Sequence, residues 1–197
     1  MDLERSFVIE SESKVIRVYI WKWNKKEDAP WQRILADVLK KDYKIENCPG
    51  ILRDEMGKPY FTEGKLQFNV SHSGEYLAIA ISENPVGVDI QEPKQIKEGM
   101  FKKVVHPKEQ SLIGADRQKD FLRLWTLKES FVKAEGKGLR ISLKDYYFEK
   151  ENERYLVNYY GQRMPWTFNI EETRIEGYLI SVCGSESEIF WEFREVI

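Results

Sequence analysis

The sequence predicts an α+β protein made of short strands and a few helices. Runs of β-branched and aromatic residues alternate with segments in which apolar residues recur at helical spacing, and turn residues separate them. With 42% hydrophobic and 32% charged residues, the composition is that of a soluble globular protein. The 197 residues suffice for one ordinary domain or two small, closely joined ones. No apolar stretch approaches the roughly 20 residues of a membrane helix.

The first half of the chain predicts a strand, a helix and then three short strands. Residues 15–23 are rich in β-branched and aromatic side chains, which favour a strand. Pro30 stands where a helix begins, and apolar residues at helical spacing extend that helix to about Tyr43. Three short strands separated by turns then predict an antiparallel meander, at residues 66–70, 76–81 and 86–90. The stretch 77–81 is almost wholly apolar, so we expect it at the centre of a sheet.

The second half predicts helices followed by strands. A short helical segment starts near Pro107, and a long helix covers about residues 119–135. Gly136 is expected to end that helix in the left-handed conformation. Strand-like runs then follow at residues 154–160, 166–170, 177–183 and 189–194. We therefore expect two α+β halves, residues 1–94 and 95–197.

Charge and cysteine content exclude several classes of protein. The 31 basic and 33 acidic residues are interspersed and give a net charge of -2, which disfavours general nucleic-acid binding. The two cysteines, Cys48 and Cys183, are far apart in the sequence, and neither has a second Cys or a His nearby at the spacing of metal ligands. We therefore expect two reduced thiols. The first five residues carry two acidic side chains and one basic side chain and lead into no apolar run of the signal-peptide type, which favours a cytoplasmic location.

The long predicted helix places two aromatic rings, an acid and a base on one face. Phe121, Trp125, Glu129 and Lys133 follow one another at intervals of four residues. One interpretation is an ordinary pair of opposite charges above two core aromatics. The other is a functional surface, because Asp89 ends an otherwise apolar strand and must find a partner there. An Asp at a strand end that faces a helical Glu is a simple way to hold Mg²⁺, although Asp89 could also be a turn residue.

A hydroxyl and one of the two histidines stand where another strand turns back. Ser71 and His72 are neighbours on this strand and should point to opposite faces, so they cannot readily form the nucleophile and base of a hydrolase. The chain also has no Gly-x-Ser-x-Gly motif. The glycines at 136 and 138 follow a helix, whereas those of a dinucleotide-binding loop precede one.

Taken together, three segments resemble the 4′-phosphopantetheinyl transferase family of the surfactin-synthetase-activating type. The segments are GKP at 57–59, FNVSHS at 68–73 running to VGVDI at 86–90, and LWTLKESF at 124–131 followed by Lys133 and GKGL at 136–139. They match the family in order and spacing, and the resemblance covers about residues 51–150. Members of the family transfer the 4′-phosphopantetheine arm of coenzyme A to a serine of an apo carrier protein, releasing adenosine 3′,5′-bisphosphate.

The resemblance implies a fold and a set of site residues. The implied fold is a pseudo-dimer of two similar α+β halves, each a small, mainly antiparallel sheet packed with a long helix, with coenzyme A in the cleft between them. Asp89 and Glu129 would hold Mg²⁺, and Lys133 would contact the phosphates of coenzyme A. Other parts of coenzyme A would be held by Lys58, Ser71, His72 and Lys128. Glu109 would be the general base that takes the proton of the attacking serine.

Two departures from the family pattern bear on the site. Gln91 stands where close relatives usually have Glu, so a metal ligand at this position would be a neutral amide oxygen or would be replaced by water. The segment between the first strand and Gly57 is also shorter, and it leaves Lys25, Lys26 and Arg33 as candidates for the adenosine 3′-phosphate.

Partners and alternatives follow from the same resemblance. We expect a monomer that acts on coenzyme A and an acyl or peptidyl carrier protein, with no nucleic-acid or membrane partner. An exposed patch with Lys102 and Lys103 would meet the acidic surface of the carrier. One alternative is a non-catalytic relative that binds coenzyme A or a carrier without transfer. A second is a hydrolase built on Ser71.

Overall fold

The computed structural model describes residues 15–22, 31–138, 142–152, 154–172, 177–185 and 188–194. Within these ranges it contains four small sheets and three α-helices, so the predicted α+β class is confirmed. Pro30, the expected helix start, lies outside the described residues. No helix of the described residues is long and apolar enough to cross a membrane.

The first sheet has the strand order β12-β1-β5-β4. Its strands are β1 (Val15–Lys22), β4 (Gln67–Ser73), β5 (Tyr76–Ser82) and β12 (Glu188–Arg194). β5 pairs antiparallel with both β1 and β4, and all seven of its residues are buried, so the predicted central position is confirmed. β1 also pairs with β12 in parallel, from the opposite end of the chain.

The second sheet corrects the predicted meander. Its strand order is β10-β11-β6, with β6 (Gly87–Gln91), β10 (Thr167–Glu172) and β11 (Leu179–Gly184). β6 does not continue from β5 but pairs antiparallel with β11, Val88 opposite Val182. Residues 87–90 are buried, because β6 lies between the first sheet and a helix. Local sequence shows that this strand is apolar but does not specify its distant partner.

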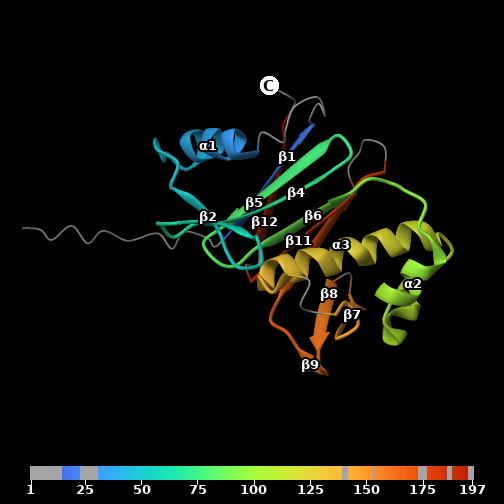
Figure 1. Cartoon of the computed structure of the whole chain (residues 1–197). Helices are drawn as coiled ribbons and strands as arrows, with labels where there is room; N and C mark the ends of the chain where they lie inside the picture. Colours follow the sequence, from blue (N-terminus) through green and yellow to red (C-terminus); the bar gives the residue numbers. More distant parts are fainter. Residues whose placement is uncertain are drawn as a thin grey trace, which may run out of the picture.

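One helix covers the outer face of each of these two sheets (Figure 1). α1 (Trp31–Asp42) packs its apolar residues, Leu35 among them, on the face of the first sheet that carries Leu77 and Ile79. The other face of the first sheet packs against the second sheet, with Ala78 and Val88 in one apolar cluster. α3 (Arg117–Glu135) lies against β6 and β11 from the far side.

The remaining elements surround these layers. They are the hairpin β2 (Ile51–Arg53) and β3 (Pro59–Phe61), the helices α2 (Glu98–Val104) and η1 (Pro107–Leu112, a 3-10 helix), and a third antiparallel group, β7 (Tyr146–Glu151), β8 (Arg154–Tyr159) and β9 (Gln162–Arg163). Sequence patterns did not predict α2, β2 or β3. Gly136 ends α3 with φ of 68°, which confirms its predicted left-handed conformation.

The two sheets do not separate at the predicted boundary. The first sheet takes β12 from beyond residue 94, and the second takes β6 from before it. That residues 1–94 and 95–197 form two similar halves therefore stays a prediction. Each of these two sheets contains strands from both segments. Cys48 and Cys183 are free thiols, as expected.

Candidate active site

The backbone of β6 lies directly against α3 at Gly87. A Cβ at this position would lie 2.0 Å from the carbonyl oxygen of Ser130 and 2.5 Å from the backbone nitrogen of Ala134. Only glycine allows this approach, because both obstacles are backbone atoms of the helix. The contact brings Asp89, two residues further along β6, beside the face of α3 that carries Glu129 and Lys133.

Asp89 is buried and accepts hydrogen bonds on both carboxylate oxygens. Oδ1 accepts from Nζ of Lys133 at 2.7 Å and from Oγ of Ser71 at 2.9 Å. Oδ2 accepts from the side-chain amide nitrogen of Gln91 at 3.0 Å. These bonds stabilise a charge that is only 3% exposed. The structure thus places three predicted site residues around Asp89, one on each of three elements.

Glu129 faces the same charges without a hydrogen-bonding partner among the described residues. It is half-buried on α3, one turn before Lys133. Burial raises the pKa of Glu129, the negative charge of Asp89 raises it further, and Lys133 lowers it. The site therefore holds two carboxylates that repel each other, and the carboxylate of Glu129 accepts no hydrogen bond from the described residues.

This donor set fits a small divalent cation. Mg²⁺ takes one or two carboxylates and completes its shell with water and phosphate oxygens. The described residues contain no group of three or more His, Cys, Asp and Glu side chains placed to hold a metal, so protein ligation would rest on Asp89 and Glu129. Gln91 turns its amide nitrogen to Asp89, while its oxygen accepts from Nζ of Lys94 at 3.1 Å. Its role as a ligand stays a prediction.

Two of the residues expected to contact coenzyme A, Ser71 and Lys58, form hydrogen bonds with Lys133. Ser71 is buried and His72 is exposed, so the predicted opposite orientation of these neighbours is confirmed. Oγ of Ser71 donates to Asp89 and accepts from Lys133 and from the backbone N–H of Ile90. Lys58, just before β3, donates to the carbonyl oxygen of Lys133 at 2.5 Å, and burial lowers its pKa.

Two predicted site residues form a separate buried ion pair. Nζ of Lys128 lies 3.0 Å from Oε1 of Glu109, and both side chains are fully buried. Glu109 accepts from the backbone N–H of His106 at 2.7 Å and of Phe148 at 2.9 Å, and Lys128 donates to the carbonyl oxygens of Leu143 and Tyr146.

Burial has opposite effects on the two partners. It raises the pKa of Glu109 and lowers that of Lys128, whereas their mutual attraction opposes both shifts. The ion pair and its hydrogen bonds therefore link three elements, η1, α3 and β7. The family resemblance implies separate roles for the two residues, and no sequence pattern indicates that they pair with each other.

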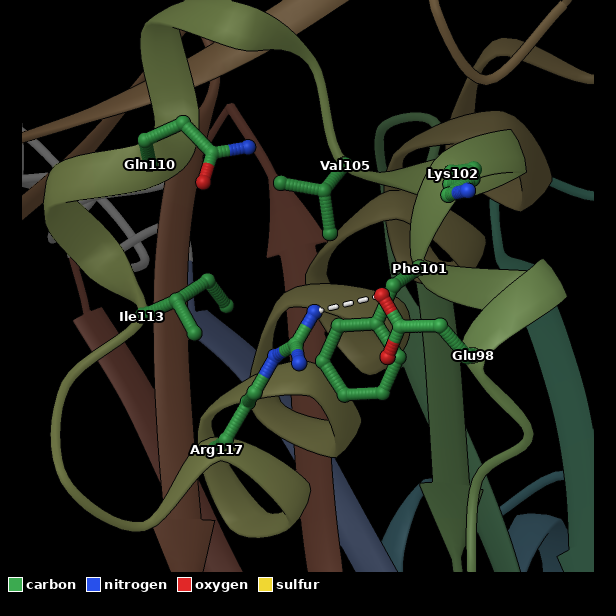
Figure 2. Close-up of a pocket in the computed structure, with 7 residues that line it drawn as sticks. All are labelled: Glu98, Phe101, Lys102, Val105, Gln110, Ile113 and Arg117. Atoms are coloured by element: carbon green, nitrogen blue, oxygen red, sulfur yellow. Dashed lines mark hydrogen bonds and ion pairs between the residues drawn. The ribbon is translucent and has the colours of Figure 1, made fainter.

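A surface cavity of about 180 Å³ lies between α2, η1 and the start of α3 (Figure 2). It is lined by Glu98, Phe101, Lys102, Val105, Gln110, Ile113 and Arg117. Arg117 bonds Glu98 at 2.9 Å across one wall and stacks over the ring of Phe101. Lys102 thus borders a partly apolar hollow. Of the candidates for the 3′-phosphate, Arg33 is exposed on α1, and Lys25 and Lys26 lie outside the described residues.

A family model and two sequence relatives indicate the same family. The family model of the 4′-phosphopantetheinyl transferase superfamily matches residues 85–183, which include β6, α3 and all but the last residue of β11. The chain is 31% identical to the 4′-phosphopantetheinyl transferase gsp of Aneurinibacillus migulanus, over 81% of this chain and 70% of that protein. It is 32% identical to the 4′-phosphopantetheinyl transferase ffp of Bacillus subtilis, over 83% of this chain and 77% of that protein. A crystal structure of the holo-[acyl-carrier-protein] synthase of Thermotoga maritima is 22% identical, with a TM-score of 0.42, and covers 50% of this chain and 61% of that one.

Proposed function

Because the chain belongs to the 4′-phosphopantetheinyl transferase superfamily, we propose that it transfers the 4′-phosphopantetheine arm of coenzyme A to a serine hydroxyl of an apo carrier protein. The leaving group is adenosine 3′,5′-bisphosphate. The observation that carries this proposal is the meeting of Asp89 on β6 with Glu129 and Lys133 on α3, inside the matched segment. The proposed enzyme is a cytoplasmic monomer with no nucleic-acid or membrane partner.

Asp89 and Glu129 are the proposed Mg²⁺ ligands. Their oxygens are of the kind that Mg²⁺ prefers, and the unpaired carboxylate of Glu129 leaves a negative charge that a cation would neutralise. When bound, Mg²⁺ supplies positive charge against the diphosphate of coenzyme A. Gln91 holds Asp89 in place through its amide, or turns to offer its oxygen as a further ligand.

Lys133, Lys58 and the β4 residues are the proposed contacts to coenzyme A. Lys133 is 26% exposed, so its ammonium can meet a phosphate while it remains beside Asp89. There it would stabilise the charge that gathers on the leaving phosphate, which is the main demand of phosphoryl transfer. His72 is exposed on β4, where its imidazole would contact coenzyme A. Ser71 uses all three of its hydrogen-bonding positions within the protein, so a bond to coenzyme A would replace one of them.

Glu109 is the proposed base for the serine proton, directly or through a water molecule. Both of its oxygens accept backbone N–H groups and its side chain is fully buried, so it must first release one of these bonds. Lys128, whose role at coenzyme A is likewise a proposal, would move with it or stay as its counter-ion.

The proposed carrier surface is the rim of the cavity between α2 and η1. Lys102 lines this cavity, Lys103 follows it on α2, and both are exposed. Carrier proteins are generally acidic around the modified serine. Replacing both lysines with Glu should raise the KM for the carrier and leave the KM for coenzyme A unchanged. The matched control replaces Lys40 and Lys41, an adjacent pair in the last turn of α1, and should change neither value.

The transfer itself is tested by mass spectrometry of several apo carrier proteins after incubation with the enzyme, coenzyme A and Mg²⁺. A carrier that gains the mass of the arm supports the proposal, and Asp89→Asn should abolish the gain. Binding of coenzyme A with no gain on any carrier would favour the non-catalytic alternative. Metal-independent turnover of an ester would favour the hydrolase built on Ser71.

A further inference from the structure

β6 has one edge that pairs with no strand among the described residues. In the order β10-β11-β6 it is the last strand, so only one of its edges pairs with β11. Strand edges leave unpaired backbone groups, which must find other partners when they are buried. Here the backbone N–H groups of Val88, Ile90 and Glu92 all point away from β11.

Side chains of β4 accept these three N–H groups in a regular series. Oδ1 of Asn69 accepts from Val88 at 2.9 Å. Oγ of Ser71 accepts from Ile90 at 3.3 Å, and Oγ of Ser73 accepts from Glu92 at 3.0 Å. The acceptor residues 69, 71 and 73 and the donor residues 88, 90 and 92 both advance by two, because alternate side chains of a strand share a face and alternate N–H groups share an edge. Side chains thus take the place of a neighbouring strand.

The same edge carries the candidate site. The carbonyl oxygen of Val88 accepts a hydrogen bond from Nζ of Lys133 at 3.0 Å. Along this edge, side chains of β4 thus bind the backbone N–H groups, and a side chain of α3 binds this carbonyl group. Ser71, the middle residue of the series, also donates to Asp89. Asn69 is 3% exposed, so the loss of one bond would leave a buried polar group unpaired. The position of Asp89 relative to β4 therefore depends on these bonds.

We propose that Asn69, Ser71 and Ser73 form a side-chain ladder that fixes the register of β4 against β6, and that Asn69 and Ser73 are positioning residues for Asp89. Neither residue touches Asp89 in the structure. They act through the β6 backbone, which they hold at both sides of Asp89. The ladder concerns the fold alone and does not depend on the function of the protein. The positioning role rests on the proposed function.

The ladder is tested by amide hydrogen exchange in Ser73→Ala, Ser73→Thr and a matched control. Removing Oγ of Ser73 should speed exchange of the Glu92 N–H by about fivefold or more, because its acceptor is lost. Threonine keeps the hydroxyl and should restore slow exchange. Ser82→Ala is the control, since Ser82 also accepts a backbone N–H, that of Asn84, but lies outside the ladder. Asn69→Ala should have the same effect at Val88.

The positioning role is tested by the affinity for Mn²⁺, measured by electron paramagnetic resonance without coenzyme A, and by transfer kinetics. Ser73→Ala should weaken Mn²⁺ binding and raise the metal concentration for half-maximal activity by about threefold to tenfold, and Ser73→Thr should restore both. Faster exchange with unchanged Mn²⁺ affinity would overturn the positioning role, and unchanged exchange would overturn the ladder. If the wild-type protein binds no Mn²⁺ and modifies no carrier, the proposed function fails together with the positioning role, while the exchange data still decide the ladder.

Discussion

Glu129 is a half-buried carboxylate that lies near Asp89 and accepts no hydrogen bond from the described residues. Replacing it with Gln removes a charge that burial and Asp89 both disfavour. The melting temperature without metal should therefore stay the same or rise, while arm transfer should fall by about a hundredfold or more. Thermal unfolding and the mass assay measure the two effects. Glu135→Gln, six residues later on α3, is the control and should retain activity. A large loss of stability in Glu129→Gln would contradict this account.

The raised pKa of Glu129 also predicts how the site responds to pH. A carboxyl group whose pKa is higher in the folded than in the unfolded protein favours folding at low pH, and this contribution is lost as pH rises through the folded-state pKa. Cation affinity has the opposite sign, because the protonated group is a poor ligand. Mn²⁺ binding and activity should fall on acidification at a pH above the range of an exposed glutamate, while the protein remains folded. A flat profile down to acid unfolding would count against Glu129 as a ligand.

The buried pair of Glu109 and Lys128 should be important for stability whether or not Glu109 is the base. Lys128→Met leaves a buried carboxylate without its counter-ion and should lower the free energy of unfolding by about 3–5 kcal/mol. Replacing both residues, with Gln and Met, should restore part of that loss. Lys40→Met breaks the exposed pair with Glu46 and should change stability by less than about 1 kcal/mol. Urea unfolding measures all three, and an equal effect at both pairs would refute the argument.

At the scale of elements, the contact between β6 and α3 depends on Gly87. Gly87→Ala places a Cβ against two backbone atoms of α3, so the helix must move away from Asp89. We expect a loss of about 1–3 kcal/mol in the free energy of unfolding, together with a loss of activity at temperatures where the variant is folded. Gly99→Ala is the matched control: this glycine lies in α2 with open space around it, so alanine should leave stability equal or higher. Denaturant unfolding that ranked the two variants in the reverse order would exclude the close contact.

Elements with a local signal were predictable from the sequence, and elements defined by distant partners were not. The apolar run 77–81 indicated the central strand β5, and the four-residue spacing on α3 placed Glu129 and Lys133 on one face. The partner of β6 lies more than 85 residues away in β11, so periodicity could not reveal it. Periodicity could not reveal the pairing of Glu109 with Lys128 either, because the two residues lie on different elements, η1 and α3.

At the scale of the whole molecule, the two sheets each combine strands from the first and the last part of the chain. β1 pairs with β12, and β6 pairs with β11. A fragment 1–94 would lose β12 beside β1 and β11 beside β6, and a fragment 95–197 would lose β6 beneath α3 and β1 beside β12. Neither fragment should show a cooperative unfolding transition alone, whereas the full chain should unfold in one step by circular dichroism and by tryptophan fluorescence. Mixing the two fragments should recover part of the native signal, because the missing strands are then supplied in trans. Cooperative unfolding of either isolated fragment would show that this half folds independently. The pairing of β1 with β12 and of β6 with β11 would then not be required for folding.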